Sequence, residues 1–113
     1  MNPNNPTPIT FVELNDDNFL ATIEGKEVCL VDFYASWCGS CRMAAPMFLR
    51  LANEAHVQIY KIEVEKNVKL KEMLTLQGLP SVGIFRNGEP VDLINTSKEE
   101  VFREFLIKNQ ILK

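Results

Sequence analysis

The chain has 113 residues and a net charge of −3, with 46% hydrophobic and 24% charged residues. These values are typical of one globular domain with its own hydrophobic core, and they argue against a disordered chain. The sequence has no basic patch and no apolar run of roughly 20 residues, so we expect neither nucleic-acid binding nor a transmembrane helix.

Residues 1–8 are rich in asparagine and proline and have no secretory signal pattern, so we expect a flexible arm before a single domain at 9–113. The domain should begin with a strand at 9–14, where apolar and polar residues alternate. A short helix is expected at 15–25, with Asn15 or Asp16 as its N-cap.

The next strand is predicted at Val28–Ala35, an apolar run typical of a central strand buried on both faces. A helix should follow from Gly39 to about Ala55, where helix propensity is high. Its buried face is expected at apolar residues that recur in four-residue steps: Met43, Met47, Leu51 and Ala55. Another strand is predicted at Val57–Val64.

In the remaining chain we expect a helix at 67–78, capped by Asn67, and two strands at 81–85 and 89–94. Asn87 and Gly88 between these strands predict a tight hairpin turn, so the strands should be antiparallel neighbours. A last helix should begin at a capping box of Ser97 and Glu100. Its apolar face would comprise Val101, Phe102, Phe105, Leu106 and Leu112.

This order of elements predicts an α/β domain with a mixed sheet covered by helices on both faces. The stretch WCGSC, residues 37–41, lies where the central strand passes into a helix. Open α/β folds place their sites there, beyond the carboxyl ends of the strands.

Cys38 and Cys41 in this stretch are two of only three cysteines. Residues three apart on a helix are neighbours, so a disulfide between them is feasible. Amide groups at the helix start would stabilise a thiolate at Cys38 by about 0.3–1 kcal/mol, which makes Cys38 the better candidate for the exposed nucleophile. Cys41, one turn deeper, would resolve the mixed disulfide by attacking Cys38.

Two other interpretations of the pair stay open. A zinc site would need two further ligands, and neither Cys29 in the buried strand nor His56 near a helix end has ligand spacing to the pair, so we expect no metal. The pair could also be two inert buried thiols. We expect Cys29 to be a small core residue and His56 to be a surface or helix-end residue.

Asp32 is the one charged residue within the predicted central strand. Burial of a lone acid predicts a raised pKa. Asp32 could be an edge residue that reaches water, or a buried carboxyl that takes a proton from Cys41 when this thiol must attack. Lys61, on the next strand, would lie close enough to tune it.

The segment LVDFYASWCGSCRMAAP, residues 30–46, resembles the active-site segment of the thioredoxin family. YKIEVEKN, residues 60–67, is similar to the family's third strand with its lysine. GLPSVGIFRNGE, residues 78–89, is similar to the segment that contains the family's cis-proline. The resemblance covers nearly the whole domain and implies a thioredoxin fold, with a mixed five-stranded sheet flanked by about four helices.

The resemblance implies a protein disulfide reductase in which Cys38 attacks, Cys41 resolves, and Asp32 with Lys61 assists proton transfer. The backbone of Leu79, before a cis Pro80, would pair with an extended segment of a substrate protein. The substrate surface would also include Trp37, Gly39, Ser40 and Gly78.

The resemblance further implies that the protein works without a bound cofactor. A thioredoxin reductase dependent on NADPH or ferredoxin would supply the electrons. We also expect a monomer. The few cysteines, odd in number, argue against a disulfide scaffold and favour a reducing, cytoplasmic setting.

The chain differs from the common family pattern at three places. Ser40 stands where a proline is usual between the cysteines, and Ser81 stands where a threonine is common after the cis-proline. The segment LINTSKEE, residues 93–100, lacks a glycine that usually forms part of the partner-docking surface. An oxidant or isomerase of the same fold, or a binding module or co-chaperone without redox turnover, are therefore kept as alternatives.

Overall fold

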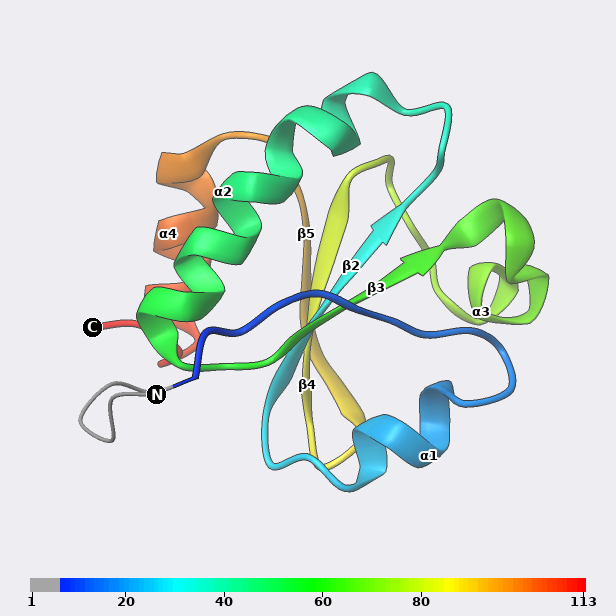
Figure 1. Cartoon of the computed structure of the whole chain (residues 1–113), viewed down its shortest axis with the longest axis horizontal. Coiled ribbons are helices and arrows are strands. Elements are labelled where there is room, and N and C mark those ends of the chain that lie inside the picture. The colour runs from blue at the N-terminus through cyan, green and yellow to red at the C-terminus, as the bar shows by residue number, and fades with distance from the viewer. Residues whose placement is uncertain (1–6) are drawn as a thin grey trace.

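The computed structural model describes residues 7–113, which form a five-stranded sheet with helices on both sides (Figure 1). The strands lie in the order β1-β3-β2-β4-β5. β1, β3 and β2 are parallel, whereas β4 is antiparallel to both β2 and β5, so the predicted mixed sheet is confirmed. The bounds are β1 Val12–Glu13, β2 Cys29–Tyr34, β3 Ile59–Glu63, β4 Ser81–Arg86 and β5 Glu89–Asn95. Residues 1–6 of the expected N-terminal arm lie outside the described residues.

Helices α2 and α4 cover one face of the sheet, and α1 and α3 cover the other (Figure 1). Between α2 and α4, the rings of Phe48 and Phe102 meet edge to face with centroids 4.8 Å apart. On the opposite face, Phe19 of α1 packs edge to face on Phe85 of β4. The bounds are α1 Phe19–Glu24, α2 Gly39–Ala55, α3 Val68–Met73 and α4 Glu99–Lys108, with a short 3₁₀ turn at Val64–Lys66.

Strand β2 lies at the centre of the sheet, and its residues from Cys29 to Phe33 are all buried. Side chains of a strand alternate between the two faces. Val31 and Phe33 therefore pack with the residues under α1 and α3, whereas Leu30 packs with those under α2 and α4. Asp32 shares the face of Leu30, so its carboxyl group points toward α2. The predicted central strand is confirmed.

The expected strand at 9–14 is shorter than predicted. Only Val12 and Glu13 pair with β3. The Asn53 side chain instead accepts a hydrogen bond from the Ile9 N–H at 2.7 Å and donates one to the Ile9 carbonyl at 2.9 Å. Because the backbone of Ile9 is satisfied by this amide, the segment needs no neighbouring strand there.

The predicted buried face of α2 is right at Leu51, and Met47 and Ala55 pack against the core, but it is wrong at Met43. Met43 is 83% exposed, and the buried positions are Cys41, Ala44, Phe48, Leu51 and Ala52. A helix has 3.6 residues per turn, so each four-residue step rotates the side chain by about 40° away from the core. Residues separated by three such steps therefore do not all stay on the buried face of the helix. A continuous buried face needs spacings that alternate between three and four residues.

Helix α3 ends at Met73 and does not continue to Gly78, because Leu74 adopts an extended conformation. Leu74 and Leu76 both pack against the core. Residues two apart point the same way in an extended chain but not on a helix, so the extended segment buries both leucines.

The predicted N-caps of α1 and α4 are wrong, whereas Asn67 stands at the N-cap position of α3 as predicted. Helix α1 begins after Asn18, so Asn15 caps only the preceding turn, where its Oδ1 accepts from the Asp17 and Asn18 N–H groups. Helix α4 begins after Lys98, so the Ser97–Glu100 box does not cap it. Asn67 precedes α3, but its side chain does not cap this helix. The cap of α3 comes from a distant segment, since Asp16 accepts hydrogen bonds from the amide groups of Lys69 and Leu70.

In α4, Phe102, Phe105 and Leu106 are buried as expected. Val101 is 39% exposed, and Leu112 lies beyond the end of the helix. The hairpin turn is confirmed by its backbone, in which Asn87 and Gly88 have φ angles of 53° and 83°. In residues 7–113, no helix has the length and apolar character needed to span a membrane.

Candidate active site

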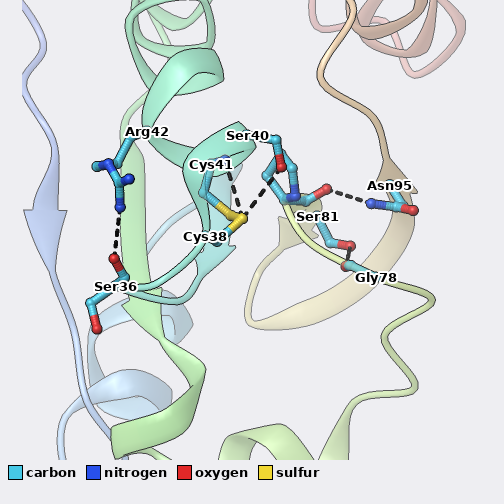
Figure 2. Close-up of a disulfide and its surroundings, with 9 residues drawn as sticks. Ser36, Cys38, Ser40, Cys41, Arg42, Gly78, Ser81 and Asn95 are labelled. Carbon is cyan, nitrogen blue, oxygen red and sulfur yellow. Dashed lines mark hydrogen bonds between the residues drawn. A yellow bond between two sulfur atoms is a disulfide. The ribbon is translucent and has the colours of Figure 1, made fainter.

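Cys38 is the N-cap of α2, directly after the turn that leaves β2. Its N–H donates to the Ala35 carbonyl at 3.0 Å, and its Sγ accepts a hydrogen bond from the Cys41 N–H at 3.2 Å (Figure 2). The turn is also held by Arg42, whose Nη1 donates to the Ser36 carbonyl at 2.8 Å. A negative charge on the sulfur would therefore face the positive end of a helix of 17 residues.

Cys38 and Cys41 form a disulfide, and their Cα atoms are 5.3 Å apart. Both residues are buried, so the expectation that Cys38 would be exposed is wrong for the disulfide form. This distance is ordinary for a disulfide, so two residues one helical turn apart can be joined without rearrangement of the backbone. A Cβ at Gly39 would meet only Arg42 Nη2, at 3.9 Å, so the structure does not require glycine here.

Asp32 is 3% exposed, and its Oδ1 has no hydrogen-bond partner in residues 7–113. Burial raises its pKa from 3.8 to about 7, although Lys61 lowers it and Glu13 raises it slightly further. Asp32 and Cys41 line one cavity between the sheet and α2, together with Phe11, Tyr34, Arg42, Ala45 and Lys61. The carboxyl group therefore lies behind the disulfide with a pKa suited to proton exchange near neutral pH.

Lys61 pairs with Asp32 in the register of β2 and β3, and with Glu13 in the register of β1 and β3. Its Nζ is 3.9 Å from Glu13 Oε1. The Tyr34 hydroxyl donates to the same Glu13 oxygen at 2.7 Å. Glu13 and Tyr34 were not among the residues predicted for the site. Tyr34 could have been predicted from its position two residues after Asp32, because residues two apart on a strand point to the same face.

Two hollows flank the Leu79 backbone, and the peptide bond between Leu79 and Pro80 is cis. Trp37, 69% exposed, lines the first hollow with Gly78 and Leu79. The second hollow is lined by Ser40, Leu79, Pro80, Asn95, Thr96, Ser97 and Lys98. Every residue predicted for the substrate surface except Gly39 thus lines one of these two hollows.

Cys29 and His56 lie apart from this arrangement. Cys29 is a free, buried thiol in β2, and burial raises its pKa to about 11 although Lys26 lowers it. His56 is exposed at the C-terminal end of α2. Within residues 7–113, no three His, Cys, Asp or Glu side chains are grouped so that they could hold a metal ion. Cys29 is therefore a core residue and His56 a helix-end residue, as expected.

The sequence matches the family model described as Thioredoxin over residues 10–108. It is 34% identical to a thioredoxin of Staphylococcus haemolyticus over 104 residues, which cover 89% of this chain and 99% of the relative. It is 40% identical to a thioredoxin of Alicyclobacillus acidocaldarius over 81 residues, which cover 69% of this chain and 76% of the relative.

The structure also resembles a chain from the crystal structure of the complex of ferredoxin:thioredoxin reductase and thioredoxin f2. The TM-score is 0.82 at 19% identity, and the match covers 92% of this chain and 99% of that one. At this identity the likeness shows that the two chains share a fold.

Proposed function

Because the chain belongs to the thioredoxin family and is a thiol-disulfide oxidoreductase, we propose that it reduces disulfides in other proteins through Cys38 and Cys41. The observation that carries this proposal is the disulfide at the N-terminus of α2, with the buried carboxyl of Asp32 behind it, whose Oδ1 has no hydrogen-bond partner in residues 7–113. The reaction needs a thiolate at Cys38 and a base for Cys41, and the structure offers a group for each.

In the proposed reaction, the Cys38 thiolate attacks one sulfur of a substrate disulfide and releases the other as a thiolate. Asp32 then takes the proton of Cys41, and the Cys41 thiolate attacks Cys38 Sγ. This second exchange breaks the mixed disulfide and releases the second substrate thiolate. The substrate gains two electrons, and the protein loses them as the bond between Cys38 and Cys41 forms. Lys61 lowers the pKa of Asp32 and so favours its basic form.

We propose that a substrate protein binds as an extended segment along the backbone of Leu79. Trp37 and Gly78 would contact the segment on one side, and Ser40 and Pro80 on the other, because these residues line the hollows that flank Leu79. Gly39, at the exposed start of α2, would lie at the margin of this surface.

A reductase dependent on NADPH or ferredoxin would return the disulfide to the dithiol form, so the protein would need no bound cofactor of its own. The fold shared with a chain from a ferredoxin:thioredoxin reductase complex is compatible with this partner. We further propose that the protein works as a cytoplasmic monomer, where reducing conditions keep Cys29 a free thiol.

The proposal is tested by trapping the mixed disulfide. The wild-type protein, kept reduced by dithiothreitol, should reduce the disulfides of insulin. Cys41→Ser should accumulate a covalent complex with the substrate, because the second attack is lost. Cys38→Ser should form none. Two results together would instead support the binding-module alternative. The wild-type protein would show no reducing activity, and partner binding would survive in the double variant with Cys38→Ser and Cys41→Ser.

The direction of the reaction is tested by the equilibrium potential of the Cys38–Cys41 pair in a glutathione buffer. A reductase should have a potential clearly below that of cytosolic glutathione. A value well above it would assign the protein to the oxidants or isomerases of this fold.

A further inference from the structure

The loop that carries Leu79 is held by two side-chain hydrogen bonds (Figure 2). Ser81 Oγ donates to the Gly78 carbonyl at 2.6 Å. Asn95 Nδ2 donates to the Pro80 carbonyl at 2.8 Å. Ser81 and Asn95 face each other in the register of β4 and β5, so both donors come from one pair at the end of the sheet. The carbonyls on both sides of Leu79 are therefore bound, one before it and one after it.

These two bonds determine where the polar groups of Leu79 point. The Gly78 carbonyl belongs to the same planar peptide unit as the Leu79 N–H, so a bond to one fixes the direction of the other. The Pro80 carbonyl belongs to the peptide unit that joins Pro80 to Ser81, directly after the unit that contains the Leu79 carbonyl. Since the proline ring restricts the intervening φ angle, a bond at this carbonyl also limits rotation of the unit that contains the Leu79 carbonyl.

Leu79 itself has no hydrogen-bond partner for its N–H or its carbonyl in the part of the chain that the structure describes. The residue is only partly buried, and it lies between the two hollows. An unpaired donor and acceptor on one residue are the groups that an extended chain needs in order to bind as an added strand.

We propose that Asn95 is a positioning residue for protein substrates, which with Ser81 holds the peptide units around Leu79 in the orientation that pairs with a substrate backbone. The proposal rests on the proposed function, because it requires an extended substrate at Leu79. Gly78 is part of the same arrangement. A Cβ there would lie 3.0 Å from Asn95 Oδ1, so any larger residue at position 78 would push the amide away.

The test compares a protein disulfide with a small one. Asn95→Ala and the nearly isosteric Asn95→Asp both remove the donor to Pro80. With insulin as substrate and dithiothreitol as reductant, each variant should raise KM about fivefold and leave kcat within about twofold, because one neutral hydrogen bond has been lost. The rate at which the reduced protein, freed of dithiothreitol, reduces 5,5′-dithiobis(2-nitrobenzoate) should stay that of the wild type, because this reagent has no peptide chain to pair with Leu79.

Glu89→Gln is the control on the same strand, since Glu89 is exposed at the other end of β5 and lines neither hollow. It should leave both reactions unchanged. An unchanged KM for insulin in both Asn95 variants would overturn the proposal, and so would an equal loss with both substrates, which indicates a general structural effect. If the wild-type protein fails to reduce insulin, the proposed function fails instead, and the two failures are thus distinguishable.

Discussion

At the scale of single residues, Asp32 is the group whose protonation should govern the second exchange. Its pKa is raised to about 7, mainly by burial, so the carboxyl is neutral at pH 5.5 and ionised at pH 8.5. Only the ionised form can accept the proton of Cys41. The resolving step should therefore become faster as the pH rises through about 7.

We predict that Asp32→Asn slows resolution of the mixed disulfide roughly tenfold to a hundredfold at pH 8.5 and has little effect at pH 5.5. Stopped flow would measure the rate of resolution of the mixed disulfide in both proteins. The ratio of the wild-type rate to the variant rate is compared across pH, because the ionisation of the thiols affects both rates and is removed by the ratio. Asp17→Asn, at an exposed position, is the control and should give a ratio near one throughout. A ratio for Asp32→Asn that does not vary with pH would contradict the role as base.

Ser40 should assist the nucleophile, because its Oγ lies 3.4 Å from Cys38 Sγ. In the dithiol form the hydroxyl can donate to the Cys38 thiolate. We predict that Ser40→Ala slows alkylation of Cys38 by iodoacetamide at pH 7 by about threefold, through the loss of this bond. Ser40→Thr should keep most of the rate. Ser36→Ala is the control, and an unaltered rate in Ser40→Ala would show that the contact does not act on the thiolate.

The site was predictable from the sequence where its residues are close together in the chain. The spacing of Cys38 and Cys41, and the acid within an apolar strand, are local patterns with a direct chemical meaning. Glu13 and Asn95 reach the site only through the register of the sheet, which places Glu13 beside Lys61 and Asn95 beside Ser81. No local pattern marks such a residue, so neither was found.

At the scale of elements, the same distinction applies to the fold. The apolar run of β2 and the Asn-Gly turn were predicted because each depends on neighbouring residues. The start of α2 at Gly39 was also predicted, whereas the side chain that caps α3 was not, because it comes from a distant segment. Asp16 caps α3 from a segment more than fifty residues away, and Asn53 takes the place of a neighbouring strand for Ile9.

The cap of α3 gives a prediction for this element. Asp16 accepts from Leu70 N–H at 3.0 Å and from Lys69 N–H at 3.3 Å, and it also brings a negative charge to the helix start. Asp16→Ala should lower the free energy of unfolding by about 1 kcal/mol and speed amide exchange in α3 more than in α2. Hydrogen exchange with mass spectrometry and urea unfolding would measure both effects.

Asp17→Ala is the matched control, because the neighbouring carboxylate is exposed and makes no hydrogen bond or ion pair in the described residues. It should leave the exchange of α3 unchanged. If Asp16→Ala and Asp17→Ala affect exchange in α3 equally, the effect is one of net charge and the capping role is wrong.

At the scale of the whole molecule, the proposed base Asp32 lies inside the hydrophobic core, between the sheet and helices α2 and α4. Asp32 shares a sheet face with the apolar residues under α2 and α4. Its ionisation therefore creates a negative charge in the buried interior, away from water. The same burial that makes Asp32 a suitable base must therefore destabilise the folded protein whenever the carboxyl is ionised.

The sign of this effect follows from the two pKa values. Unfolded Asp32 should titrate near 3.8, whereas folded Asp32 titrates at about 7. Between these values the folded state binds more protons, so the free energy of unfolding falls as the pH rises from about 4 to about 7, and then stays level. The full difference between 3.8 and about 7 corresponds to about 4 kcal/mol at about 1.36 kcal/mol for each tenfold change in acidity.

Asp32→Asn should therefore be more stable than the wild-type protein above pH 8, by up to about 4 kcal/mol, and similar to it near pH 4. Urea unfolding of the oxidised proteins at both pH values would measure this difference with the disulfide kept constant. Asp17→Asn should match the wild-type protein at both. An Asp32→Asn protein that is less stable at pH 8.5 would mean that the ionised carboxylate is held by favourable contacts. The raised pKa, and with it the assignment of Asp32 as the base for Cys41, would then be wrong.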